Sequence, residues 1–137
     1  MKTESDIIIE KVRTFFQAHF HEIAVVTVFG SVVKNRLRKD SDVDIGIACE
    51  SEMTLERRIA VATELSGFLH RDVDIIDLSK ENGFIITEAV SSGKIIIKRN
   101  TETLRKIIRK MWYWNSDFAP LMRRSLDRKA QRFIYGT

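Results

Sequence analysis

The chain has 137 residues, of which 44% are hydrophobic and 31% charged, and its net charge is +4. This size and balance predict one globular domain over residues 1–137 and exclude a disordered chain. The single cysteine, Cys49, excludes an internal disulfide and a cysteine-rich zinc site, and the apolar runs are too short for a membrane helix. The mildly basic net charge is compatible with an anionic binding partner. Because no secretory signal pattern is present, we expect a cytoplasmic protein.

The first half of the chain predicts a helix followed by two strands. Apolar residues recur at helical spacing over residues 5–20. The β-branched runs at residues 24–29 and 43–48 each predict a short strand. A polar and basic segment separates the two runs and shows little periodicity, so we expect it to be a loop.

A second helix is predicted over residues 54–69, with Thr54 as its N-cap. The apolar residues of this segment recur at helical spacing, which is the pattern of an amphipathic helix. The residues expected on its apolar face are Leu55, Ile59, Ala62, Leu65 and Leu69.

The next segment predicts a strand, a short helix and another strand. The run at residues 72–78 is apolar and β-branched, as expected of a strand. Ser79 is then expected to cap a short helix that continues to about Val90 and is closed by Gly93. Residues 94–98 form the fourth predicted strand.

The C-terminal part is predicted to be helical over about residues 101–135. The segment "NSDFAP" interrupts the pattern, and Pro120 suits the first turn of a last helix. The basic residues of this tail and the aromatic "MWYWN" suit two packed amphipathic helices, or a surface for a protein or RNA. The apolar residues of the last helix are Leu121, Met122, Leu126, Ala130 and Phe133.

The predicted element order is α-β-β-α-β-α-β-α-α. It indicates the α/β class in its mixed α+β form, with a small mixed sheet of about four strands flanked by helices. The C-terminal helices then form an extension of the domain.

Two aspartates alternate at the second predicted strand. Asp42 and Asp44 are two residues apart, so their side chains share one face of the strand. The valine and isoleucines between and after them face the other way, into a core. Gly46 follows on the acidic side, where the missing side chain is expected to leave room above the sheet.

The third predicted strand repeats this arrangement. Asp72 and Asp74 share one face, and if the two strands are neighbours, Asp74 can approach Asp42 and Asp44. We favour Asp74 over Asp72 as the third carboxylate because it lies deeper in the apolar run. Asp77 faces the other side and is expected to be structural or a cap.

Three carboxylates that lie close together repel one another, and without compensation one of them holds a proton. A divalent cation removes this conflict, and Mg²⁺ prefers one or two carboxylates together with substrate phosphates. Two such ions can clamp an attacking oxygen and a leaving phosphate. The simpler alternative is a pair of acids that discourages pairing at a sheet edge.

The turn before these acids suits a phosphate group. Gly30 lets the backbone come close to a ligand, and Ser31 offers a hydroxyl and an N–H to phosphate oxygens. The residues that follow and could add positive charge are Lys34, Arg36, Arg38 and Lys39.

Gly30-Ser31, ten intervening residues and then Asp42-Val43-Asp44 match the motif G-S-x10-D-x-D. In this the chain resembles the polymerase-β-like nucleotidyltransferases, and "SDVDI" and "RDVDIIDLS" are similar to the minimal nucleotidyltransferases. The resemblance covers about residues 5–98. Within that group the chain looks like the MntA-type antitoxins encoded beside HEPN-domain toxins. Those antitoxins transfer AMP from ATP to a tyrosine of the toxin ribonuclease and so silence it.

This resemblance implies a Mg²⁺-dependent nucleotidyltransferase that uses ATP as substrate and two Mg²⁺ ions. Gly30 and Ser31 would hold the triphosphate. Family members often continue Gly-Ser with a small residue, Arg and Gly, whereas this chain has Val32-Val33-Lys34-Asn35. Lys34 would supply the charge of the arginine without its fork geometry.

The resemblance also implies roles for the acids. Asp42 and Asp44 would bind Mg²⁺, and Asp74 would be the third catalytic and metal-binding carboxylate, which takes the proton of the attacking hydroxyl. The implied partner is a HEPN-family toxin encoded by a neighbouring gene, and the pair would form a hetero-oligomer.

Two other functions stay open at this point. The chain could be a binding antitoxin that docks through residues 101–137 and keeps only a vestigial nucleotide site. It could also transfer nucleotides to a small molecule or to an RNA end. So short a chain shows no separate acceptor-binding domain, which favours an acceptor presented by another protein.

Overall fold

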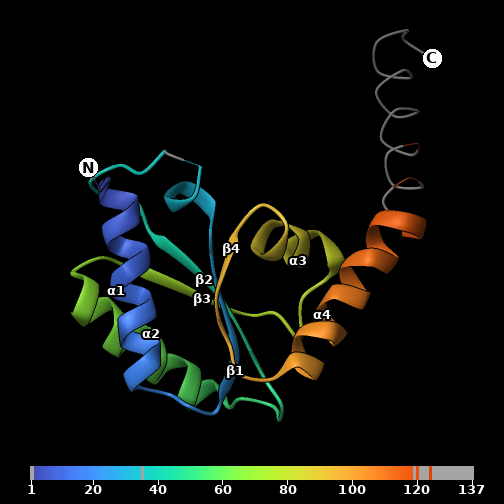
Figure 1. The fold of residues 1–137 in the computed structure, drawn as a ribbon, viewed down its shortest axis with the longest axis horizontal. Coiled ribbons are helices and arrows are strands. Elements are labelled where there is room, and N and C mark those ends of the chain that lie inside the picture. Colours follow the sequence, from blue (N-terminus) through green and yellow to red (C-terminus); the bar gives the residue numbers. More distant parts are fainter. Residues whose placement is uncertain (1, 35, 119, 121–123, 125–137) are drawn as a thin grey trace, which may run out of the picture.

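The computed structural model describes residues 2–34, 36–118, 120 and 124. Every helix predicted before residue 114 and every predicted strand is present in the expected order (Figure 1). The helices are α1 (Glu4–Ala18), α2 (Leu55–Leu69), α3 (Gly83–Val90) and α4 (Thr101–Tyr113). The strands are β1 (Ile23–Phe29), β2 (Val43–Cys49), β3 (Val73–Asp77) and β4 (Lys94–Lys98).

The strands form one mixed sheet in the order β3-β2-β1-β4. β1 is antiparallel to both of its neighbours, β2 and β4, whereas β2 and β3 run parallel. A parallel pair needs a crossover connection, which α2 supplies here. The predicted mixed sheet with flanking helices is confirmed.

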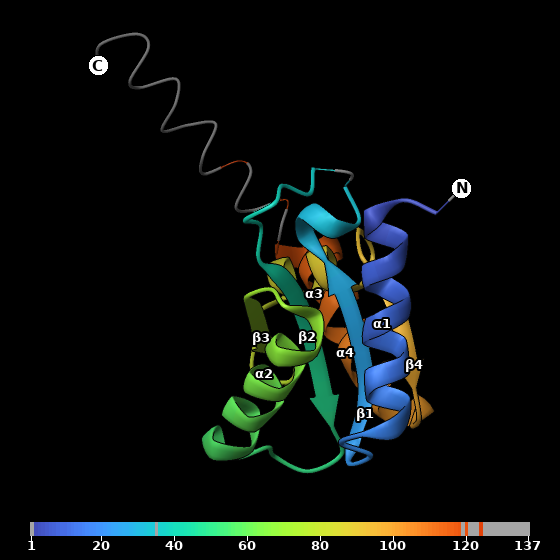
Figure 2. The same ribbon diagram turned by 90° about the vertical axis from the view of Figure 1, so that its left-hand side faces the viewer.

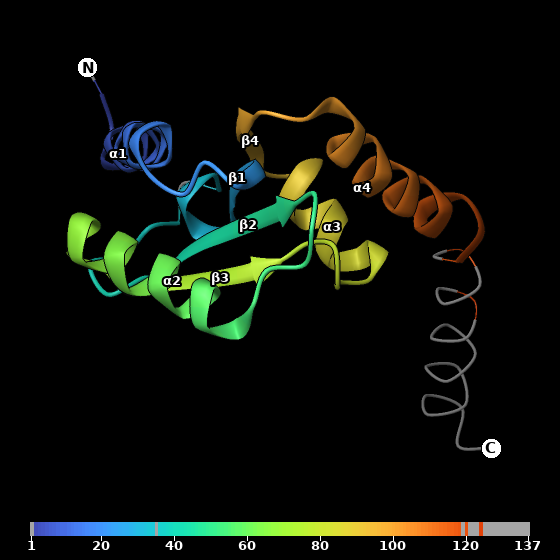
Figure 3. The same cartoon turned by 90° about the horizontal axis from the view of Figure 1, so that it is seen from below.

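Helices cover both faces of this sheet. Figure 2 shows α1 and α2 in front of the strands with α3 and α4 behind, and Figure 3 shows the same layers from below. Val26 and Val28 of β1 belong to the core under α1 and α2, whereas Val25 and Phe29 belong to the core under α3 and α4. A central strand buried on both faces is expected to be almost continuously apolar, as β1 is.

The end of α1 is fastened to the sheet by an arginine at the end of β4. The Arg99 guanidinium donates to the carbonyls of Ile23 at 2.9 Å and Phe20 at 3.2 Å, and also to the carbonyl of Phe16. These carbonyls belong to the last turn of α1, to the connection that follows it and to the first residue of β1. The contact therefore lies at the end of β1 opposite Gly30.

The apolar face predicted for α2 is wrong in its first half. Thr54 is the N-cap as predicted, but Leu55 and Ile59 are 62% and 55% exposed. The buried stripe instead continues back toward Arg57, whose guanidinium lies 4.5 Å above the Phe20 ring. Leu55 and Ile59 lie outside this stripe and face solvent. The buried residues of α2 are Val61, Leu65 and Leu69.

The N-cap predicted for the short helix α3 is also wrong. Asn82, and not Ser79, accepts hydrogen bonds from the first N–H groups of α3. The N–H and hydroxyl of Ser79 donate instead to Asp77 Oδ1, at 3.1 and 2.6 Å. Asp77 is buried and holds this turn, as its predicted structural role requires. The helix ends at Val90, three residues before Gly93.

The predicted interruption after α4 is a π-helix, Trp114–Phe118, so the chain keeps a helical path there. The apolar residues of the last predicted helix, between 121 and 133, lie outside the described residues, and the single domain over 1–137 stays a prediction. Within the part of the chain that the structure describes, none of the helices has both the length and the apolar character needed to cross a membrane.

Candidate active site

The Gly-Ser turn and the first aspartates meet at one end of the sheet. Because β1 and β2 are antiparallel, the end of β1 lies beside the start of β2, and Phe29 is the register partner of Asp44. Gly30 follows with a φ of +75°, a left-handed conformation that glycine adopts without strain. A Cβ on Gly30 would lie less than 3.0 Å from Asp44 Oδ2, so any side chain here would displace the carboxylate.

Ser31 lies in the short 3-10 helix Gly30–Val32 that follows β1. The N–H of Lys34 bonds to the Gly30 carbonyl at 3.2 Å, and the N–H of Arg36 bonds to the Ser31 carbonyl at 3.1 Å. These two hydrogen bonds fix the Gly-Ser turn to the residues that follow it in the chain. The half-buried Ser31 hydroxyl has no hydrogen-bond partner among the described residues, so it can bond to a ligand.

Asp44 and Asp74 lie side by side on neighbouring strands. They are register partners in the parallel pair of β2 and β3, so their side chains point to the same face of the sheet. Asp42 and Asp74 are exposed, and Asp44 is half-buried. Asp72 precedes β3, and its carbonyl accepts the N–H of Val43 at 2.9 Å. The register therefore brings Asp74, and not Asp72, to Asp44.

Repulsion within this cluster shows in the pKa of Asp44. Burial raises that pKa most, and the negative charges of Asp74 and Asp42 raise it further. Over residues 2–34 and 36–118, none of these three carboxylates takes part in a hydrogen bond or an ion pair. The described protein groups therefore leave the repulsion uncompensated.

The carboxylates of this cluster suit Mg²⁺ that is bound together with a nucleotide. Among the described side chains, no three His, Cys, Asp or Glu groups are gathered tightly enough to hold a metal ion by themselves. Mg²⁺ takes one or two carboxylates and completes its shell with water and substrate phosphates. The residues therefore fit ions that arrive with a nucleotide and do not form a finished metal cage.

The expectation that Gly46 leaves room above the acidic face is wrong. A Cβ on Gly46 would lie 2.6 Å from Thr27 Oγ1 and 3.0 Å from the methyl groups of Leu78. The layer of α3 and α4 covers this face, so the neighbouring side chains fill the space. The acidic cluster is therefore closed along the sheet at Gly46.

Lys34, predicted to bind phosphate, has a partner within the fold. Its Nζ lies 3.1 Å from Glu88 Oε2 on α3, and both side chains remain partly exposed. An exposed pair of this kind is weak, so a triphosphate can compete for the ammonium group. Its role in nucleotide binding stays a prediction.

Comparison with known proteins decides the family. Residues 10–102 match the family model described as "Polymerase beta, Nucleotidyltransferase", which covers more than half of the chain. The chain belongs to this family. The matched span includes Gly30-Ser31 and Asp42-Val43-Asp44, which lie together in the structure.

The relatives of this family member include a toxin–antitoxin group. Protein adenylyltransferase MntA of Shewanella oneidensis is 24% identical over 84 residues, and the match spans 61% of this chain and only 60% of that relative. A crystal structure of a toxin–antitoxin with AMP-PNP gives a TM-score of 0.65 at 19% identity, over 93% of this chain and 96% of that one. The tri-AMPylated Shewanella oneidensis HEPN toxin in complex with MNT antitoxin gives 0.60 at 17%, over 96% and 97%. With the family match, these findings confirm the resemblance to MntA-type minimal nucleotidyltransferases.

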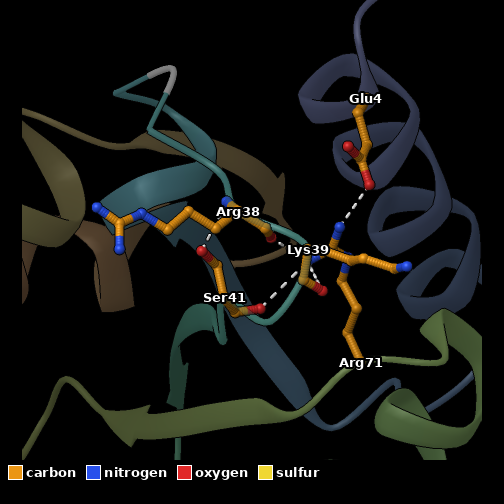
Figure 4. Close-up of polar contacts among 5 residues, drawn as sticks. All are labelled: Glu4, Arg38, Lys39, Ser41 and Arg71. Atoms are coloured by element: carbon orange, nitrogen blue, oxygen red, sulfur yellow. Dashed lines mark hydrogen bonds and ion pairs between the residues drawn. The ribbon is translucent and has the colours of Figure 1, made fainter.

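Sequence reasoning missed one residue beside the nucleotidyltransferase motif. Arg71 precedes "DVDI" in the third strand region, as Ser41 precedes it in the second. Because β2 and β3 pair in parallel with Val43 opposite Val73, the residues before the two motifs come together. Arg71 reaches the loop before Asp42, as Figure 4 shows. The repetition of "DVDI" in the two strand regions was the sequence feature from which this contact could have been predicted.

The raised pKa of Asp44 predicts that Asp44→Asn stabilises the metal-free protein at neutral pH. A carboxyl whose pKa is raised in the folded state contributes stability below its unfolded pKa, and this contribution is lost as pH rises through the folded pKa. Asparagine does not ionise, so the variant does not lose this stability as the pH rises. Because the group is half-exposed, solvent screening limits the gain to under about 1 kcal/mol.

The measurement is urea unfolding in EDTA at pH 7 and again at pH 3. The wild type should approach the variant in stability as the pH falls. Asp40→Asn, which changes an exposed acid of the preceding loop, is the matched control. If Asp44→Asn gains no more than this control at pH 7, the repulsion is not a cost to the fold.

Proposed function

We propose that this nucleotidyltransferase transfers AMP from ATP to a tyrosine hydroxyl of a HEPN-family toxin encoded beside it, and so acts as an antitoxin. The observation that carries the proposal is the approach of Gly30 to the Asp44 carboxylate, with Asp74 in register beside it. The relative named protein adenylyltransferase MntA, and the tri-AMPylated HEPN toxin in a complex of the same fold, support the choice of acceptor.

The proposed roles follow from position. The bare backbone of Gly30 lets the triphosphate lie against the turn, and the Ser31 hydroxyl bonds to a phosphate oxygen. Asp42 and Asp44 would hold the metal–nucleotide complex at the strand ends, and Asp74 would be the third ligand. When bound, two Mg²⁺ ions would neutralise charge on the attacking and leaving oxygens. Lys34 would release the Glu88 carboxylate and bind a phosphate group of the nucleotide.

The reaction is an in-line substitution at the α-phosphorus. The acceptor oxygen forms a bond to that phosphorus while the bond to the bridging oxygen breaks, and pyrophosphate leaves. The proton of the acceptor hydroxyl goes to Asp74, which is exposed and can receive it from a group on another protein. Positioning and electrostatic stabilisation account for most of the catalysis in such a site.

The test is the intact mass of the neighbouring gene product after co-expression with this chain. We expect increments of one AMP unit with the wild type and none with the Asp42→Asn/Asp44→Asn variant. Equal increments with both would show that the carboxylates do not catalyse the transfer. No increments and no complex would favour a small molecule or an RNA end as the acceptor.

A second function is favoured by the outer surface of α4. Trp112 and Tyr113 are 70% and 66% exposed there, which suits an antitoxin that neutralises its partner by docking alone. Neutralisation that survives the aspartate substitutions but is lost on deletion of residues 101–137 would support this function. In the mass experiment it would appear as a complex without increments.

A further inference from the structure

Arg71 is a mostly buried cation that contacts the turn before Asp42. Its side chain is only 11% exposed, and the residue lies two positions before β3, next to the loop that leads into Asp42. One terminal nitrogen, Nη1, donates to the carbonyls of Arg38 at 3.0 Å, Lys39 at 3.4 Å and Ser41 at 3.2 Å. The other, Nη2, pairs with the Glu4 carboxylate on α1 (Figure 4).

The loop that Arg71 binds is a closed turn. The N–H of Arg38 donates to Ser41 Oγ at 2.7 Å, and the N–H of Ser41 donates to the Arg38 carbonyl at 3.1 Å. The turn can therefore move as a unit, and the next residue after it is Asp42. Asp42 itself lies outside β2, so its position depends on this turn and on Val43, the first residue of the strand.

The backbone of Arg71 is fixed as firmly as its side chain. Its carbonyl accepts the hydroxyl of Ser66 on α2 at 2.6 Å, and the next carbonyl, of Asp72, accepts the N–H of Val43 at 2.9 Å. The guanidinium thus joins α1 and the turn to the junction of α2 and β3. A planar group with five donors can serve several carbonyls and a carboxylate at once, which an ammonium group does less well.

We propose that Arg71 is a positioning residue for nucleotidyl transfer, which fixes the turn at residues 38–41 and thereby sets Asp42 beside Asp44. The inference rests on the proposed function, because it assigns Arg71 to the same site. Arg71 touches neither of these carboxylates, so its effect passes through the main chain of the turn. Loss of the guanidinium leaves Asp42 on a loose turn and weakens its hold on a metal–nucleotide complex.

The test compares Arg71→Gln with Arg99→Gln. Arg99 makes the same kind of contact, a guanidinium on three main-chain carbonyls, at the end of β1 opposite Gly30. Both variants lose these bonds and should lose stability, but only Arg71→Gln should change the site. The measurements are kcat and KM for ATP in toxin modification, and Mn²⁺ binding with a non-hydrolysable ATP analogue, followed by electron paramagnetic resonance.

We expect Arg71→Gln to weaken Mn²⁺ binding and lower kcat about 10- to 100-fold, as substitution of a group that orients metal ligands commonly does. Arg71→Lys should recover part of both losses, and it keeps the test possible if the glutamine variant does not fold. Arg99→Gln should match the wild type in both measurements at a temperature where it is folded.

Equal kcat and equal Mn²⁺ binding in the two glutamine variants would overturn the inference and leave Arg71 with a structural role only. If the wild type modifies no toxin, the proposed function fails, but the Mn²⁺ comparison still decides whether Arg71 positions Asp42. The two failures are therefore distinguishable.

Discussion

Asp74→Asn will lower the rate of AMP transfer by about 10²- to 10⁴-fold, the range expected for loss of a general base. The register of β2 and β3 places Asp74 opposite Asp44 on one face of the sheet, where it also raises the pKa of that carboxyl. Asparagine keeps the shape of the side chain but neither accepts the proton nor binds a cation as strongly. The assay is the rate of modification of the purified toxin, followed by intact mass.

Asp72→Asn is the matched comparison, because it changes an aspartate of the same motif two residues away. Asp72 contributes its main-chain carbonyl to the N–H of Val43, and that bond survives the substitution. We expect it to keep most of the wild-type rate. The reverse ranking of the two variants would show that Asp72 is the third carboxylate.

Gly30→Ala will cost at least about 100-fold in rate and also destabilise the fold. The residue has a φ of +75°, which costs a residue with a Cβ about 1 kcal/mol or more. Its Cβ would also lie less than 3.0 Å from Asp44 Oδ2. Because the carboxylate must move to make room, the metal–nucleotide complex is misplaced, and displacement by 1 Å can cost about 10² in rate.

Gly67→Ala is the control for this substitution. Gly67 lies inside α2, and a Cβ there would have no neighbour within 4 Å. Alanine in an exposed helix should stabilise the protein by about 1 kcal/mol and leave the rate unchanged. In an Asp44→Ala background, which lacks the clashing carboxylate, the added loss of stability from Gly30→Ala should be smaller. Full activity of Gly30→Ala would mean that Asp44 can shift without loss of function.

Much of this site could be predicted from local pattern. The apolar runs at residues 24–29 and 43–48 become β1 and β2, and an antiparallel pair joined by a short segment brings the end of one strand to the start of the other. That is why Gly30 meets Asp44. The alternation of acid and apolar residues in "DVDI" likewise required Asp44 and Asp74 to share a face once β2 and β3 were neighbours.

The parts that could not be predicted depend on residues far apart in the chain. Lys34 and Glu88 are separated by 54 positions, and Glu4 and Arg71 by 67, so no local pattern indicates either pair. Gly46 was expected to leave open space because its own segment does not show that Leu78 fills it. The exposure of Leu55 and Ile59 in the first half of α2 was likewise not indicated by the spacing of apolar residues within that helix.

The repeated "DVDI" motif also has a consequence for errors in strand pairing. If β3 slipped by two residues along β2, Val43 would face Ile75, and every apolar side chain would still point to the core. Asp42, and not Asp44, would then stand opposite Asp74. Burial alone does not separate these two arrangements. Arg71 does, because the slip would carry its guanidinium two residues away from the carbonyl of Ser41. A side chain outside the acidic cluster thus helps to decide which acids compose it.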